Sequence, residues 1–167
     1  IAAAKRTMLD LAYRQFLKES YSRSEPNLEP QTARAKLLER FIQAEGEALE
    51  LYAIFQTLEE ERRLIQSKTV SWQEWPKQLL SPGSAVREYG KRHRKRVRFF
   101  QYIQWIATEQ LNEIRRTAEQ VGMPIGLYND LALGADRNGA EAWMYQSVLA
   151  LDAECGAPPD PFALEGE

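Results

Sequence analysis

The sequence of 167 residues is poor in reactive side chains: it contains one cysteine and one histidine. Cys155 alone cannot build an internal disulfide framework, and His93 alone excludes a histidine-rich metal site. Because no second histidine is available to activate the thiol, we interpret Cys155 as a free, buried or half-buried cysteine rather than a nucleophile. Apolar runs are short and interrupted by charge, so we expect no segment that spans a bilayer.

Other familiar signals are missing as well. Residues 1–4 lead directly into Lys5 and Arg6 without the layout of a signal peptide, so we expect a cytoplasmic protein. The chain opens on Ile1 rather than Met, which predicts that it is an excerpt of a longer protein. The sequence has no glycine-rich phosphate loop, no metal-ligand spacing and no Ser/His/Asp arrangement.

The composition that remains is that of a soluble globular protein. Hydrophobic residues make up 44% and charged residues 28% of the chain. A chain of this length fits one domain that buries roughly 70% of its unfolded surface. The formal net charge of −2 predicts no strong attraction to nucleic acid or to an acidic membrane.

Apolar side chains recur at three- and four-residue steps through the first two-thirds of the sequence. This spacing predicts helices over residues 3–18, over residues 31–63 with a bend at Gly46, and over residues 84–121. The last of these is expected to be the longest. Ser71 is placed to cap a short helix, and Gly122 is placed to end the long helix in a left-handed conformation.

The pattern changes after Gly122. Residues 123–128 are short, apolar and glycine-containing, which favours a buried strand; residues 136–139 indicate a turn. Residues 141–150 could form one more helix, and the prolines of residues 156–162 predict an extended or looped tail. A single strand cannot satisfy its own backbone groups in a core, so we expect the rest of a sheet or barrel outside this chain.

The basic run at residues 91–98 contains six lysines and arginines. Taken alone it resembles a nucleic-acid-binding patch, and a helical interaction or nucleic-acid-binding module is the alternative function. On a helix, however, these side chains point in all directions rather than along one stripe. We therefore interpret the run as the polar start of the long helix.

Aromatic and acidic side chains offer further candidates. The cluster at residues 99–105 could stack on sugars, but its helical spacing favours core packing, and Trp72 and Trp75 are expected to pin a loop to the helices. Residues 59–61, three glutamates, are interpreted as surface. Asp130 differs because an acid beside a buried strand is costly unless it has partners, and the carboxyl ends of barrel strands face active sites. Asp160, between two prolines, is a weaker candidate on the same grounds.

Three segments together are specific. They are residues 126–134 (GLYNDLALG), residues 139–143 (GAEAW) and residues 156–162 (GAPPDPF), in that order and with natural spacing. They resemble the barrel-strand segment and following loop of amylomaltases, the 4-α-glucanotransferases of glycoside hydrolase family 77. The resemblance covers residues 72–162 well and the first helices only loosely.

The resemblance implies a fold and a substrate. The chain would be mainly α, with a helical insertion and barrel helix over residues 1–121. Residues 122–167 would supply one strand and an active-site-side loop of a parent (β/α)₈ TIM barrel. The family transfers segments of α-1,4-glucans and maltooligosaccharides to the 4-hydroxyl of an acceptor by a retaining mechanism. No organic cofactor, nucleic acid or membrane partner is implied.

The resemblance also assigns site residues. Asp130 matches the strand-end aspartate that contacts sugar near the cleavage point, and Pro158, Pro159 and Asp160 match a loop beside the glucan cleft. The nucleophile of the family lies in a later Arg-x-Asp segment, and its acid/base glutamate lies further on. Neither segment occurs in this sequence, so we expect the chain alone to be inactive.

Overall fold

The computed structural model describes residues 2–22, 29–66, 70–130, 134–153, 156, 158–159, 161–162 and 164–165. Its elements are helices: α1 (Ala2–Ser20), α2 (Ala33–Gln66), the 3₁₀ turns η1 (Trp72–Glu74) and η2 (Lys77–Leu79), α3 (Ser84–Arg92), α4 (Arg94–Gln120) and α5 (Ala140–Met144). The only β pairing within the described ranges is an isolated antiparallel bridge between Tyr21 and Pro30. The expected mainly α class is confirmed for this chain.

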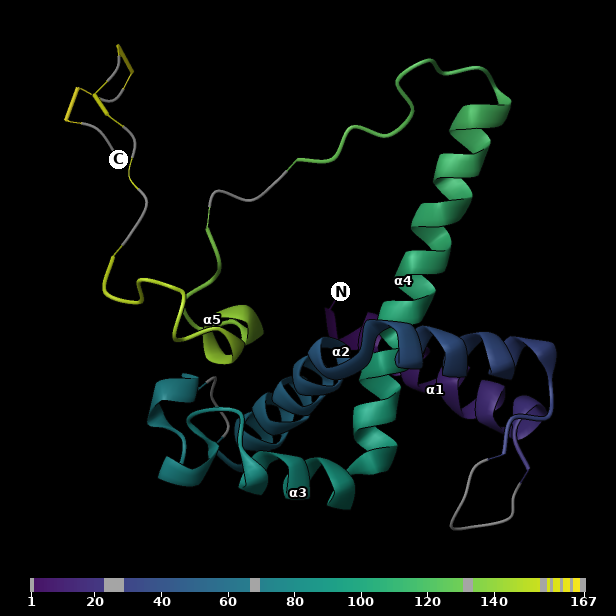
Figure 1. Cartoon of the computed structure of the whole chain (residues 1–167), viewed down its shortest axis with the longest axis horizontal. Helices are drawn as coiled ribbons and strands as arrows, with labels where there is room; N and C mark the ends of the chain where they lie inside the picture. Colours follow the sequence, from purple (N-terminus) through teal and green to yellow (C-terminus); the bar gives the residue numbers. More distant parts are fainter. Residues whose placement is uncertain are drawn as a thin grey trace.

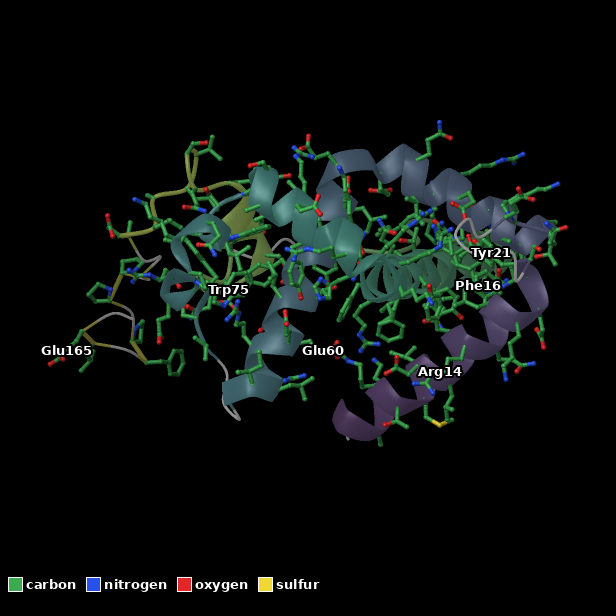
Figure 2. All side chains as sticks on the ribbon, turned by 90° about the horizontal axis from the view of Figure 1, so that it is seen from below. Arg14, Phe16, Tyr21, Glu60, Trp75 and Glu165 are labelled. Atoms are coloured by element: carbon green, nitrogen blue, oxygen red, sulfur yellow. The ribbon has the colours of Figure 1, made fainter. Side chains whose placement is uncertain are left out.

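Helix α4 crosses α1 and α2, and its C-terminal half projects beyond them (Figure 1). Aromatic side chains fill the crossing. Phe16 of α1 packs against Tyr102 and Trp105 of α4, with ring centroids 5.1 and 5.8 Å apart, and against Tyr21 (Figure 2). Phe99 is also buried. The interpretation of residues 99–105 as core is confirmed.

A second aromatic cluster joins α2 to the loop and to α5. The Phe55 ring lies 5.2 Å from that of Trp75 and 5.5 Å from that of Trp143. The Trp72 indole donates a hydrogen bond to the Arg137 carbonyl over 3.0 Å. The two tryptophans of the loop therefore pin it to the helices, as expected from the sequence.

The three glutamates of residues 59–61 are not a solvated surface run, so that interpretation is wrong. Arg96 of α4 donates hydrogen bonds from Nε and Nη2 to the Glu60 carboxylate over 2.5 and 2.6 Å. Its Nη1 donates to the Asp10 carboxylate of α1 over 2.6 Å. Arg6 adds a third contact to Glu60 at 2.9 Å. Neighbouring helices thus supply cations that sequence periodicity cannot reveal, and the network ties α1, α2 and α4 together.

Three local predictions are confirmed. Gly46 bends α2 with φ 58° and ψ −136°. The Ser71 side chain accepts a hydrogen bond from the Gln73 amide at the start of η1. At the end of α4, Gly122 has φ 75°, and its amide and that of the next residue donate back into the last helical turn, which is a Schellman cap.

Two helix predictions need correction. The helix expected over residues 84–121 is broken at His93 (φ −104°, ψ 22°), where the imidazole stacks on Tyr89 at 3.9 Å. The break turns α3 so that its buried face lies against α2 as well. The helix expected over residues 141–150 ends at Met144 because the Gln146 side chain donates to the Trp143 carbonyl, which a continuing helix would use.

The strand expected over residues 123–128 is not formed. Residues 123–130 have no regular structure and are exposed apart from the half-buried Gly126. A strand is stable only when neighbouring strands accept and donate its backbone hydrogen bonds, and no described residue supplies them here. The backbone of this segment therefore faces solvent in the isolated chain.

Candidate functional site

The residues predicted to contact sugar lie on two different segments. Asp130 is exposed at the end of the extended segment that follows α4, and Pro158 and Pro159 are exposed beyond α5. These segments run apart on either side of α5 (Figure 1). Asp160, like Cys155, lies outside the described residues. The chain by itself therefore does not bring the predicted residues together into a closed site.

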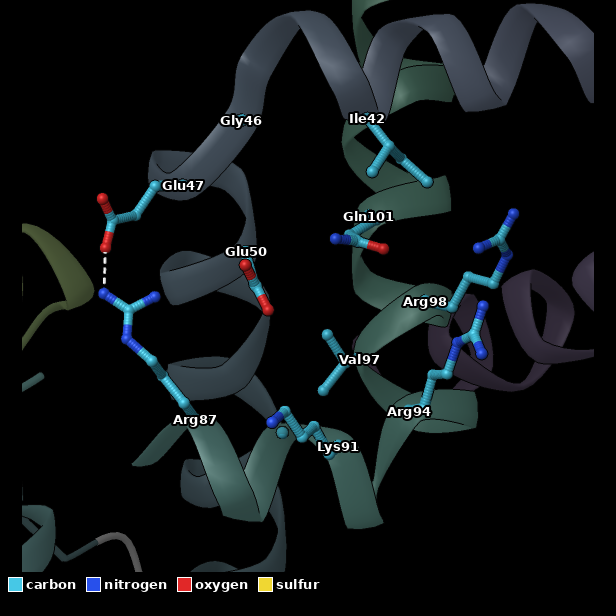
Figure 3. A pocket seen from close by; sticks show the side chains of 11 residues that line it. Ile42, Gly46, Glu47, Glu50, Arg87, Lys91, Arg94, Val97, Arg98 and Gln101 are labelled. Atoms are coloured by element: carbon cyan, nitrogen blue, oxygen red, sulfur yellow. Dashed lines mark hydrogen bonds and ion pairs between the residues drawn. The ribbon is translucent and has the colours of Figure 1, made fainter. Parts of the chain in front are cut away.

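The structure instead places a hollow at the bend of α2, between α2, α3 and α4 (Figure 3). Its volume is about 690 Å³. The bend at Gly46 forms its upper edge, and the apolar side chains of Ile42 and Val97 line it. This volume falls within the range of ~300–1,000 Å³ that is usual for pockets holding small organic ligands.

Polar groups enter this hollow from all three helices. Glu47 and Arg87 form an ion pair across its rim, and Glu50 of α2 and Gln101 of α4 extend into it from opposite sides (Figure 3). Lys91 of α3 lies at its lower edge. Sequence reasoning missed this site, since residues 46–50 carry no motif and the three helices converge only through long-range packing.

Gln101 is one of two buried polar side chains in this lining, since it and Arg98 are each only 7% exposed; the Arg98 Nε is buried without a partner among the described residues. The Gln101 amide has no hydrogen-bond partner among the described residues. The amide atoms are not among the fully buried, unpaired polar atoms of the described residues, so they keep some contact with solvent in the hollow. Gln101 therefore keeps one acceptor oxygen and two N–H donors available to whatever occupies the hollow.

A smaller hollow of about 290 Å³ lies beneath the loop that carries Trp72 and Trp75. Glu59 lines it beside Asn138, and burial raises the pKa of this glutamate above its ordinary value, while Arg63 and Arg6 act to lower it. Within the described parts of the chain, no three histidine, cysteine, aspartate or glutamate side chains group closely enough to hold a metal ion.

The basic run at residues 91–98 is divided by the packing. Arg96 is held by Glu60 and Asp10, and the buried Arg98 pairs with Glu39. Burial lowers the pKa of Arg96, but its hydrogen bonds to Glu60 and Asp10 outweigh that effect and raise it. Lys91 and Arg94 stay exposed. A nucleic-acid-binding role for the run stays a prediction.

Comparison with known proteins decides the family. The sequence profile of glycoside hydrolase family 77, described as 4-alpha-glucanotransferase, matches residues 1–167. The chain belongs to this family. The resemblance drawn from residues 126–134, 139–143 and 156–162 is thereby confirmed, and the family match extends over the helices that those motifs do not cover.

Relatives named 4-alpha-glucanotransferase are similar over most of the chain. The protein from Mycobacterium tuberculosis is 36% identical over 144 residues, which cover 81% of this chain and 20% of the relative. The one from Haemophilus influenzae is 30% identical over 138 residues, covering 80% and 20% respectively. A protein from Synechocystis is 26% identical over 166 residues, or 94% of this chain and 31% of the relative. The chain thus spans about a fifth to a third of the length of these glucanotransferases.

None of the helices in the described ranges of this glucanotransferase-family chain combines the length and the apolar content needed to cross a membrane.

Proposed function

We propose that this chain is the helical insertion and part of the barrel of a cytoplasmic 4-α-glucanotransferase. The enzyme would transfer segments of α-1,4-glucans and maltooligosaccharides to the 4-hydroxyl of an acceptor sugar by a retaining mechanism, without an organic cofactor. The observation that carries the proposal is the family match over residues 1–167, together with relatives named for this activity.

The division of the chain at residues 121 and 122 is part of this proposal. Apolar side chains collect at the free end of α4 and just beyond it: Leu111 is 57%, Ile114 52%, Val121 69%, Met123 54% and Ile125 83% exposed. Ile114, Val121 and Met123 also line an apolar hollow of about 360 Å³. Exposed apolar surface on this scale indicates an interface. We infer that residues 122–167 and this helix end pack against the remainder of the barrel.

Asp130 follows directly after this apolar segment. If residues 123–128 join a parallel barrel sheet, Asp130 comes to lie at the carboxyl end of a strand, where barrel enzymes place their active sites. Its carboxylate would accept hydrogen bonds from sugar hydroxyls near the cleavage point. Pro158, Pro159 and Asp160 would form the stiff loop beside the glucan.

The test uses maltotriose, because two molecules of it are converted by this reaction into glucose and maltopentaose. The full-length protein that carries this chain is expected to form both products, detected by chromatography of the sugars. The 167-residue chain alone is expected to form neither, because the Arg-x-Asp segment and acid/base glutamate expected of the family do not occur in it. Turnover by the chain alone would show that its catalytic residues have been misassigned.

A further inference from the structure

Positive charge predominates in the lining of the hollow at the bend of α2. Four basic side chains line it against two carboxylates: Arg87, Lys91, Arg94 and Arg98 against Glu47 and Glu50. Arg87 is paired with Glu47, and the buried Arg98 is paired with Glu39 outside the lining. Lys91 and Arg94 are exposed, and neither has a hydrogen-bond or ion-pair partner in the described ranges. The hollow therefore keeps a surplus of positive charge even when Glu39 is counted with it.

The unpaired Arg94 stands next to the buried Arg98 on α4. The two residues are one helical turn apart, and their side chains extend in the same direction (Figure 3). Arg98 is fixed by Glu39 and by a hydrogen bond from its Nη2 to the Tyr21 hydroxyl over 3.2 Å. Within the described parts of the chain, Glu39 is the one carboxylate that contacts these two guanidinium groups. Their combined field favours a further anion beside Arg94.

Glu50, the unpaired carboxylate of the lining, belongs to the other side of the hollow. The hydrogen bond to Glu47 raises the pKa of Arg87, and the charges of Glu47 and Glu50 raise it further, so Glu50 lies within electrostatic reach of Arg87. In the close-up view, Val97 lies between Glu50 and the side chains of Arg94 and Arg98 (Figure 3). An anion held by Arg94 is thereby kept on the side of the hollow away from Glu50.

The rest of the lining fits the organic part of a phosphate ester. Val97 and Gln101 follow Arg94 along one face of α4, and Gln101 is seven residues, or about 10 Å, further along the helix. Val97 and Ile42 offer apolar contacts, and the Gln101 amide offers N–H donors and an acceptor oxygen. The volume of about 690 Å³ leaves room for a sugar-sized group in addition to a phosphate.

We propose that this hollow binds a small phosphate ester. Arg94 holds the phosphate group beside the charges of Arg98 and Lys91, and the organic part lies over Val97 toward Gln101. A planar guanidinium suits this role because it donates two parallel hydrogen bonds to phosphate oxygens. The inference does not rest on the proposed transfer of glucans, since no step of that reaction needs a phosphate ester.

The experiment is isothermal titration calorimetry of the full-length protein that carries this chain, in a buffer free of phosphate. Ribose 5-phosphate is the probe, and ribose and inorganic phosphate are the comparison ligands. Ribose 5-phosphate is expected to bind more tightly than either, and potassium chloride is expected to weaken its binding. No binding of ribose 5-phosphate, or equal binding of ribose or of inorganic phosphate, would overturn the proposal.

Substitutions locate the binding site. Arg94→Gln is expected to weaken binding of ribose 5-phosphate about tenfold or more, because it removes charged donors to the phosphate. Arg92→Gln is the matched control: Arg92 is exposed in the same basic run, lies outside the lining and contacts Glu88 at 4.0 Å. This variant should stay within about twofold of the unmodified protein. Glu50→Gln should bind more tightly, because it removes a like charge from the hollow.

The same variants distinguish a pocket from a merely basic surface. Unchanged affinity in Arg94→Gln, or equal losses in Arg92→Gln and Arg94→Gln, would overturn the proposal, and so would weaker binding in Glu50→Gln. Since Arg94 has no partner in the described ranges, its replacement should leave the urea midpoint of the protein unchanged. A short DNA duplex that binds more tightly than ribose 5-phosphate, and is weakened alike by both arginine variants, would assign the basic run to nucleic acid instead.

Discussion

Trp143 holds the C-terminal segment to the helices, and its replacement by alanine should destabilise the fold severely. The side chain is completely buried in α5. Its ring lies 5.5 Å from Phe55 and 6.3 Å from Trp75, and its indole N–H donates to the Leu79 carbonyl over 2.9 Å. One residue thus joins α2, the 3₁₀ turns and α5.

The size of the effect follows from these contacts. Truncation of a buried aromatic side chain to alanine costs about 3–5 kcal/mol through lost apolar burial and the cavity that remains. The substitution also removes the indole N–H that donates to the buried Leu79 carbonyl, which is left without this hydrogen bond. Trp143→Phe keeps most of the apolar volume and loses the donor, so it should cost only about 1–3 kcal/mol. A small domain is stable by ~5–15 kcal/mol, so Trp143→Ala removes a large share of the total.

Urea unfolding followed by far-UV circular dichroism measures these differences. Tyr145→Ala is the control, since this aromatic side chain is two residues away and 44% exposed; it should change the free energy of unfolding by about 0.5 kcal/mol or less. A free energy of unfolding for Trp143→Ala within about 1 kcal/mol of the unmodified chain would refute the view that α5 is anchored by this side chain.

Three further substitutions test the bends, the packing and the charges of the helices by the same unfolding measurement. Gly90→Ala places a methyl group 2.5 Å from Cδ1 of the buried Ile54 and should cost about 1–3 kcal/mol, and a neutral result would contradict this packing. Gly46→Ala meets no atom within 4 Å but requires a strained φ of 58°, so it should also cost about 1–3 kcal/mol. Gly83→Ala, whose new methyl group would meet only an atom at 3.8 Å, serves as its near-neutral comparison. Burial raises the pKa of Glu59 in the folded chain above its ordinary value in the unfolded chain. As the pH rises through this interval, the unfolded chain loses the Glu59 proton before the folded chain does, so the free energy of unfolding should fall. Glu59→Gln should reduce that loss, and an unchanged pH dependence of the urea midpoint would count against it.

Sequence periodicity predicted the helices because their apolar faces repeat locally. It also located Gly46 and Gly122, whose backbone conformations only glycine adopts readily. It failed at His93, because the break between α3 and α4 depends on the fit of α3 against α2 and not on any residue that normally ends a helix. The predicted strand at residues 123–128 failed for a related reason: an apolar segment becomes a strand only when partners are present.

The candidate site shows the same limit. The sequence motifs indicated the family and Asp130, because the residues of each motif are adjacent in the sequence. Glu50, Lys91 and Gln101 come from three helices, and no local spacing relates them. Arg96 and Glu60, which form an ion pair, stand in two charged runs, residues 91–98 and 59–61, whose sequences resemble ordinary solvated helix faces. Contacts between distant helices can be recognised only after the fold is known.

The central claim, that this chain supplies a sugar-contacting aspartate to a glucanotransferase, is tested most directly by maltotriose transfer in the full-length protein with Asp130→Asn. The account predicts that formation of glucose and maltopentaose falls about tenfold or more, since a hydrogen bond to a charged group contributes ~1.5–3 kcal/mol. Asp152→Asn, a change at another exposed aspartate, should leave the rate unchanged. Full activity in Asp130→Asn, or no transfer by the unmodified protein, would contradict the account.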